Sequence, residues 1–371
     1  MSEDLQVQPG MLALLRESRG LTQAELARAM TKASVDGSTP VSQGYVSRAE
    51  KGQLTVTGER LELYAAALGY PAELLAVDPE VAGVGVGLVH HRKRASLSAP
   101  ALRRIHAQLG LTRYQVSRLE ELAGRRPSQL SVPRIEVDDE LSPRDAAREV
   151  RRLWSLQPGP VDNLILVLEE AGCLVVTVDL DSDLLDAASQ WPKGQDPLLL
   201  LNSRAPGGRC RFSVAHELGH LVMHGTPGAG TKQEKEADAF ASEFLMPAAD
   251  IRSAFKSQVD LARLAGLKSV WKVSMAALLR RAFQLGALSE WNYRTLTIEM
   301  SALGYRTAEP VEIAREQPGR VPDVVRRLLG ECGMNIAEAA ACARLLPEDF
   351  QRLYVEAACM SSLSPSLKVR P

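Results

Sequence analysis

The feature of this chain that most constrains its fold is a His-Glu-x-x-His run, in which His216 and His220 flank Glu217. Residues four apart lie one turn above each other on the same face of a helix. Both imidazoles could therefore reach one cation, with Glu217 beside the open coordination position. The apolar residues of a buried helix surround them: Phe212, Val214, Ala215, Leu218 and Leu221. The run predicts a buried helix that carries half of a metal site.

The third ligand is expected on a second helix, downstream in residues 234–247. Glu234 and Asp238 lie one helical turn apart there. Zinc held by two imidazoles and one carboxylate keeps a fourth position for water, and Glu234 would complete this ligand set. A ligating histidine usually donates its other ring N–H to a carboxylate, which fixes its tautomer and orientation. We therefore predict Glu234 as a ligand and Asp238 as the carboxylate that orients a histidine.

This predicted site has the composition of a hydrolase. A zinc ion of this kind lowers the pKa of its bound water from about 15.7 to roughly 7. Glu217 could accept the proton as that water attacks a peptide carbonyl, and could later deliver it to the leaving amine. Glu217 is therefore predicted to be the general base.

Three further residues compete for roles at this site. His224 continues the same helix face, but three consecutive turns would spread over about 12 Å at 1.5 Å per residue, so a supporting role is expected. Glu236 and Glu243 compete with Glu234. Glu236 points about 200° round the helix from Glu234, and the partner Asp238 favours Glu234. The alternative, that the histidines match the pattern by chance, is weak because three of only six histidines fall in this run.

Length and composition indicate a protein of several domains. A chain of 371 residues with 45% hydrophobic content can form two or three cores. The net charge is −1, so any nucleic-acid contact must come from a local basic patch. The five cysteines show no CxxC spacing, which argues against a cysteine metal site. The chain has no run of 18 apolar residues and no secretion signal at its start, so we expect a cytoplasmic protein without a membrane segment.

Residues 9–76 have the pattern of short helices separated by turn signals. Thr22 and Ser42 are placed to cap two of these helices, which is the arrangement of a helix-turn-helix. The second of them would enter the DNA major groove. The candidate base-reading residues are Gln43, Ser47 and Arg48, and the candidate phosphate contacts are Gln23, Lys51 and Arg60. The alternative is an ordinary helical bundle with solvated polar residues.

The middle of the chain reads as a connector followed by alternating helices and strands. A strand or loop is expected at residues 81–87, and the basic cluster 91–94 either touches phosphate or is simply solvated. The apolar run 197–202 before the metal helix predicts a strand. In zinc peptidases such a strand lines the cleft, and a free edge can hold an extended substrate by main-chain hydrogen bonds. A fully paired core strand is the equal alternative.

Two resemblances join these observations. Residues 21–27 and 41–52 resemble the Xre (Cro/C1-type) helix-turn-helix family, although residues 31–40 make the turn longer than usual. Residues 209–220 and 234–247 are similar to the ImmA/IrrE metallopeptidase family, over roughly residues 146–283. This resemblance implies a gluzincin-type peptidase that uses zinc, or alternatively manganese. It also implies cleavage of an Xre-type repressor in a stress response, with the same ligand and base assignments.

The sequence thus predicts a mainly α protein with four regions. These are a helix-turn-helix domain at 9–76, a helical connector at 77–142, an α+β zincin-like domain with a small sheet at 143–256, and a helical region at 257–371. One hypothesis is a zinc endopeptidase tethered to a double-stranded DNA operator, which cleaves a repressor there or its own linker near residues 80–95. The other is a DNA-binding regulator whose metal domain only senses metal or a small ligand. Either would suit a homodimer on paired half-sites.

Overall fold

The computed structural model groups the chain into two compact units. One comprises residues 1–87, 95–126 and 319–371, and the other comprises residues 88–94 and 127–318. The four-region division remains a prediction. The predicted strand or loop at 81–87 and residues 92–94 of the basic cluster lie outside the described part of the chain. The residues that the structure describes are 5–34, 39–80, 89–91, 97–124, 128–225 and 230–356.

The first unit begins with a bundle of five short helices. They are α1 (Pro9–Ser18), α2 (Gln23–Ala33), α3 (Gln43–Glu50), α4 (Glu59–Leu68) and α5 (Ala72–Leu75). Thr22 caps α2 with a reciprocal capping box to Glu25, and the Ser42 side chain caps α3, as the sequence predicts. The α2 helix extends to Ala33, three residues beyond its expected end. Residues 31–33 of the long predicted turn are therefore helical.

A long helix and the last described helices complete this unit. They are α6 (Ala99–Ala123), α15 (Arg320–Gly330), α16 (Ile336–Cys342), α17 (Pro347–Phe350) and the π-helical turn η3 (Gln351–Val355). Arg320 pairs with Glu120 of α6 at 2.8 Å, and the Tyr354 hydroxyl donates to Gln115 of α6 at 2.8 Å. These contacts join residues 320–356 to α6, which lies about 200 residues earlier in the sequence.

The second unit contains a four-stranded sheet in the order β1-β3-β4-β2. Strand β2 (Leu174–Val178) is parallel to β4 (Leu198–Asn202), and β3 (Ala187–Gln190) is antiparallel to β4. Strand β1 (Val89–His91) is antiparallel to β3. Because β4 is paired on both sides, the suggestion that the run 197–202 offers a free edge is wrong. The neighbours of β4 are β2 on one side and β3 on the other.

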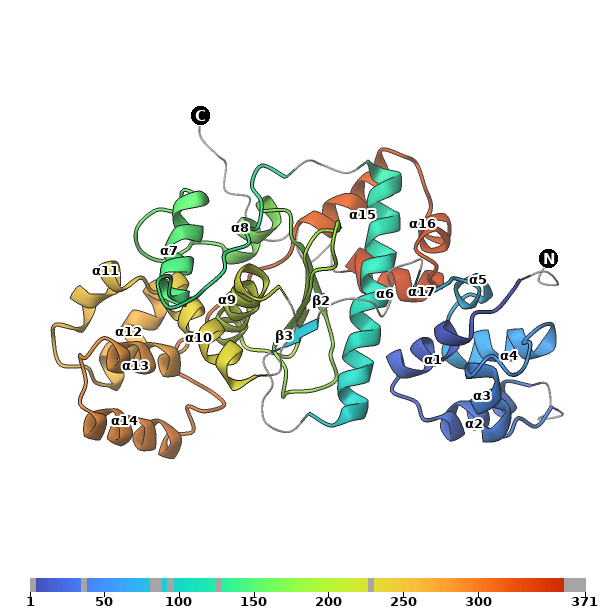
Figure 1. Ribbon diagram of the computed structural model, residues 1–371, viewed down its shortest axis with the longest axis horizontal. Helices are drawn as coiled ribbons and strands as arrows, with labels where there is room; N and C mark the ends of the chain where they lie inside the picture. The colour runs from blue at the N-terminus through green and yellow to red at the C-terminus, as the bar shows by residue number, and fades with distance from the viewer. Residues whose placement is uncertain are drawn as a thin grey trace. The chain divides into compact units, whose positions relative to one another are not determined.

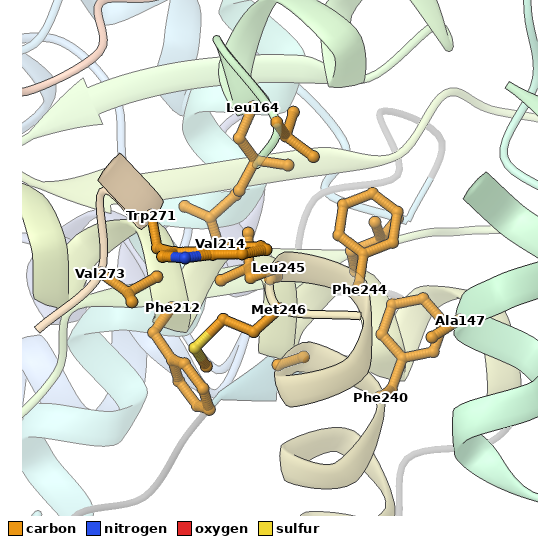
Figure 2. Packing of buried hydrophobic residues seen from close by; sticks show 14 of the residues in the cluster. Ala147, Leu164, Phe212, Val214, Phe240, Phe244, Leu245, Met246, Trp271 and Val273 are labelled. Carbon is orange, nitrogen blue, oxygen red and sulfur yellow. The ribbon is translucent and has the colours of Figure 1, made fainter. Parts of the chain in front are cut away.

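The second unit also contains a series of helices. They are α7 (Pro143–Leu153), α8 (Leu164–Glu170), α9 (Gly207–Met223), α10 (Thr231–Leu245), α11 (Ala248–Ile251), the 3-10 turn η2 (Arg252–Phe255), α12 (Leu261–Trp271), α13 (Met275–Gln284) and α14 (Glu290–Ala302). Helix α9 packs against β3, β4 and α10, and Figure 1 shows α9 and α10 beside each other. Their apolar faces share one core (Figure 2), in which Phe240 and Phe244 of α10 stack at 5.7 Å.

The predicted fold class is confirmed. The protein is mainly helical, with an N-terminal helical bundle, a mixed α/β region with a small sheet, and helices toward the C-terminus. Among the described helices, none is long and apolar enough to cross a membrane.

Candidate metal centre and nucleic-acid interface

The structure brings His216, His220 and Glu234 together. Nε2 of His216 lies 3.1 Å from Nε2 of His220, and these two atoms lie 3.4 and 3.3 Å from the two carboxylate oxygens of Glu234. Atoms that bind one tetrahedral cation at about 2.0–2.1 Å stand roughly 3.3 Å apart. The spacing of the three groups therefore fits a single small divalent cation.

Hydrogen bonds on the far sides of the imidazoles set their tautomers. Nδ1 of His216 lies 3.0 Å from Oδ1 of Asp238. A carboxylate accepts, so we assign the proton to Nδ1, which leaves the Nε2 lone pair directed at the site. Arg280 lies 3.5 Å from the other oxygen of Asp238. The Asp238 side chain thus has the position expected of an orienting carboxylate.

A second chain of hydrogen bonds reaches His220 from behind. Nε2 of His224 lies 3.0 Å from Glu236, and Nδ1 of His224 lies 2.9 Å from Nδ1 of His220. If His224 donates through Nε2 to the Glu236 carboxylate, its Nδ1 accepts from His220, and the Nε2 lone pair of His220 also points at the site. Burial lowers the pKa of His224, which favours the neutral ring that this arrangement needs.

Two lone pairs then face each other across 3.1 Å. Such an arrangement is repulsive unless a cation lies between them. The donor set of two neutral imidazoles and one carboxylate is one that zinc prefers. The chemistry of the groups and their spacing therefore agree.

Glu217 lies fully buried on the same helix, and Ser189 of β3 donates a hydrogen bond to its Oε2 at 2.6 Å. Burial raises the pKa of Glu217 above its ordinary value, and this outweighs the opposite influence of His220, His216 and the Ser189 hydroxyl. A carboxyl with a raised pKa holds a proton more readily than an ordinary glutamate does, which suits a group that accepts and returns a proton.

The competing carboxylates have other partners. Glu236 pairs with His224 at 3.0 Å. Glu243 is buried between Arg281, which donates to it, and Arg148 at 3.0 Å. Burial raises the pKa of Glu234, but the two histidines beside it lower that pKa by more, so the Glu234 carboxylate is ionised at neutral pH. Of the three glutamates, only Glu234 faces both histidines.

Two glycines of α9 allow close approaches by other segments of the domain. A Cβ atom on Gly219 would lie 3.1 to 3.2 Å from the ring of Phe240, so the glycine lets α10 approach α9 closely. A Cβ on Gly207 would meet the carbonyl oxygen of Ile313 at 2.3 Å, so the first turn of α9 also needs a glycine. Glu234 can therefore reach both histidines because α9 has no side chain at position 219.

Comparison with known protein families agrees with this geometry. Residues 168–283 match the peptidase M78 family model, described as an IrrE N-terminal-like domain, and residues 12–75 match a helix-turn-helix model. The chain carries an IrrE N-terminal-like domain and a helix-turn-helix domain. No curated protein matches the chain. The helix-turn-helix domain implies DNA binding, and the IrrE-like domain belongs to a peptidase family that is generally metal-dependent.

In the helix-turn-helix domain, the candidate DNA contacts lie on or beside α2, α3 and α4. Gln43 and Arg48 are exposed on α3, and Ser47 is half-buried between them. Gln43 donates to Gln23 at 2.8 Å, and Gln23 donates to Glu50 at 2.8 Å. These bonds bring the first residues of α2 and α3 together at one surface, where a helix N-terminus favours phosphate.

The two remaining candidate contacts, Lys51 and Arg60, differ in their surroundings. Lys51 is exposed at the end of α3. Arg60 of α4 is half-buried, with its guanidinium 5.0 Å from the centre of the Tyr45 ring and 3.5 Å from the carbonyl oxygen of Pro40. Lys51 is therefore the more accessible of the two, and the roles of all six residues in DNA contact remain predictions.

Ser189 and the pair His224–Glu236 are the site residues for which sequence reasoning gave no specific partner. His224 was recognisable as a supporting residue from its helical spacing, but its bond to Glu236 crosses between α9 and α10. Ser189 reaches Glu217 from a strand 28 residues earlier. Neither contact follows from a local sequence pattern.

Proposed function

We propose that this protein is a DNA-binding regulator whose IrrE-like domain is a metal-dependent endopeptidase that cleaves a repressor-type protein. One observation carries the proposal. Two imidazole nitrogens and one carboxylate stand at tetrahedral spacing on the same helix pair that carries a buried carboxylate, Glu217. Zinc is the cation that this donor set favours, and manganese is the alternative.

His216, His220 and Glu234 would hold the cation. When bound, it supplies Lewis acidity and makes a water molecule acidic near neutral pH. Asp238 and the pair His224–Glu236 keep the two imidazole lone pairs aimed at the cation.

Glu217 would transfer a proton during the reaction, first as a base and then as an acid. It accepts one proton from water as the C–O bond to the peptide carbonyl forms, and it returns that proton to the amide nitrogen as the C–N bond breaks. Ser189 holds the Glu217 side chain in one orientation through its 2.6 Å hydrogen bond. Ser189 is thus a positioning residue for the base.

The DNA-binding half would be supplied by α3 and its neighbours. Gln43, Ser47 and Arg48 would meet base edges in the major groove, and Gln23, Lys51 and Arg60 would contact the phosphate backbone. A second copy would occupy the other half-site of a paired operator. The protein substrate would then be an Xre-type repressor held near the same DNA, or the chain's own linker.

A regulator that only senses metal is the second candidate. The burial of His216, His220 and Glu217, each no more than 1% exposed, favours it because a sealed site admits no peptide. The retained carboxylate favours the peptidase, since sensing alone needs no base beside the open position.

The two candidates separate in one experiment. The zinc-loaded protein is incubated with Xre-type repressors encoded beside it, with and without chelator, and any fragments are mapped by mass spectrometry. The peptidase proposal predicts defined fragments that chelator abolishes and that the Glu217→Gln variant does not produce. Intact repressors together with normal gene regulation by Glu217→Gln would favour the sensor.

A further inference from the structure

One edge of β3, the strand that carries Ser189, is covered by the chain's own linker. Val89 pairs with Gln190, His90 with Ser189 and His91 with Ala188, so β1 adds an antiparallel strand to β3. The main chain of His90 therefore lies opposite Ser189, whose hydroxyl bonds to Glu217 at 2.6 Å. Cα atoms of β1 also lie within 8 Å of Cα atoms of α9, the helix that carries Glu217.

An edge strand is a natural receptor for an extended peptide. Its unpaired N–H and C=O groups add a further strand through main-chain hydrogen bonds, largely independent of that strand's sequence. The other side of β3 is already paired with β4 in register over all four residues, Ala187 to Gln190. Only the side that β1 holds could receive a substrate strand.

Four groups of the candidate site are buried in the conformation in which β1 pairs with β3. The exposed fractions are 0% for Glu217 and Ser189 and 1% for His216 and His220, whereas the Glu234 side chain is 33% exposed. A peptide carbonyl must approach both Glu217 and the cation before it can be hydrolysed. Access to the buried base therefore requires a change at this part of the domain.

We infer that β1 is an intramolecular occupant of the substrate position, so that the linker competes with an extended substrate segment for the edge of β3. This inference rests on the proposed peptidase function and deepens it. The substrate class is a segment in extended conformation, bound mainly through its backbone. Release of β1 regulates access to Glu217.

Proline substitutions test this pairing with a control inside the strand. In an antiparallel pair, alternate residues of the edge strand direct their N–H and C=O groups at the partner. Either His90, or Val89 together with His91, therefore donates to β3. Proline cannot donate, but it is tolerated on an edge strand where the N–H faces away. Among the variants Val89→Pro, His90→Pro and His91→Pro, proline should release β1 only at the positions whose N–H groups point at β3. The variants at the other positions, where proline is tolerated, are the matched controls.

Hydrogen–deuterium exchange of the β3 amides measures the pairing of β1 with β3 independently of peptidase activity. In the full-length, metal-loaded Glu217→Gln protein, we expect β3 amides to be protected. Proline at a donating position should speed their exchange, and proline at the other position should not. Excess casein, an unstructured protein, should restore protection only in the variants in which β1 is released. Equal metal content in all variants shows that the domain is folded.

The cleavage rate measures the competition between β1 and a substrate for the edge of β3. With Glu217 intact, zinc-loaded variants that release β1 should cut fluorescein-labelled casein about tenfold faster than the parent, which corresponds to the loss of one or two backbone hydrogen bonds. The tolerated proline variants should match the parent. Metal-dependent scission of the parent within residues 89–91, seen by intact mass, would also support occupancy of the site by the linker.

Three results would overturn the inference. These are equal β3 exchange in the parent and all three proline variants, failure of casein to protect β3 once β1 is released, and measurable cleavage at the same rate in all proteins. A different result would overturn the proposed function instead. If no zinc-loaded protein cuts casein or the repressors, while β3 exchange still alternates with proline position and casein protects the released edge, the linker occupies a binding edge of a domain that is not a peptidase.

Discussion

Nδ1 of His224 lies 2.9 Å from Nδ1 of His220, so a histidine outside the ligand set holds a ligand in place. Its other nitrogen contacts Glu236 of α10 at 3.0 Å. The same helix pair therefore supplies the third ligand, Glu234, and both outer partners, Glu236 and Asp238. The two helices define the metal centre beyond the three groups that would touch the cation.

Replacing His224 by Phe should weaken zinc binding by about 10- to 100-fold, because His220 loses the acceptor that fixes its tautomer. Competition with a chromophoric chelator measures this affinity. Glu236→Gln should weaken it less, since the amide oxygen can still accept from His224. Unchanged zinc affinity in His224→Phe would show that the bond to His220 has no orienting role.

Replacing Glu217 by Gln should leave zinc binding intact and slow peptide cleavage by about 10²- to 10⁴-fold, because the amide cannot accept the proton. Metal analysis and fragment mapping on the same preparation measure the two effects. If gene regulation depends on cleavage, it should be lost in the same variant. Full cleavage by Glu217→Gln would exclude this residue as the base.

The stability of the metal-free protein should depend on pH through Glu217. Burial raises the pKa of this carboxyl in the folded state. The contribution of Glu217 to the free energy of unfolding is therefore fully present below its unfolded pKa of about 4.3. It is lost as the pH rises through the pKa that Glu217 has in the folded protein. In the presence of chelator, Glu217→Gln should therefore be more stable than the parent at pH 8, with the difference shrinking toward pH 5. Urea unfolding measures it, and a difference that does not vary with pH would contradict the assignment.

Placing a methyl group at Gly219 should push α10 away from α9. Overpacking against Phe240 costs about 1–3 kcal/mol, and the better helix propensity of Ala returns at most about 1 kcal/mol. Gly219→Ala should therefore lower the free energy of unfolding and weaken zinc binding, because Glu234 moves with α10. Gly266→Ala is the control. Apart from its chain neighbours and the backbone of its own helix, no described heavy atom lies within 4 Å of a Cβ built on Gly266, so the same change there should stabilise.

Replacing Lys51 by Ala should weaken binding to non-specific duplex DNA and reduce the slope of log affinity against log salt by about 0.9, the value for one phosphate contact. Fluorescence anisotropy over a salt series measures both. Lys32→Ala removes the same charge at the far end of α2, where Lys32 is exposed, and should leave the slope unchanged. Identical slopes for the two variants would argue against a phosphate contact by Lys51.

Local patterns were enough to predict the elements that carry the site. The spacing of His216, His220 and Glu217 is a property of one helix, and the caps Thr22 and Ser42 act within one turn. Those predictions needed no knowledge of the tertiary structure. The grouping of His216, His220 and Glu234 followed from the combination of two such helices.

Contacts between distant segments could not be predicted in this way. The pairing of β1 with β3 joins residues about 100 positions apart, and a three-residue strand has too little periodicity to be recognised. The apolar run 197–202 was ambiguous for a related reason, since a strand's pattern shows its burial but not which of its edges is paired. The contact between Arg320 and Glu120 likewise depends on the tertiary fold.

Anomalous diffraction from a crystal of the zinc-loaded protein, recorded on both sides of the zinc absorption edge, tests the central claim most directly. We expect one peak per chain, about 2.0–2.1 Å from Nε2 of His216, from Nε2 of His220 and from a carboxylate oxygen of Glu234. No peak, or a peak bound by other residues, would contradict the proposed metal centre and the peptidase function that depends on it.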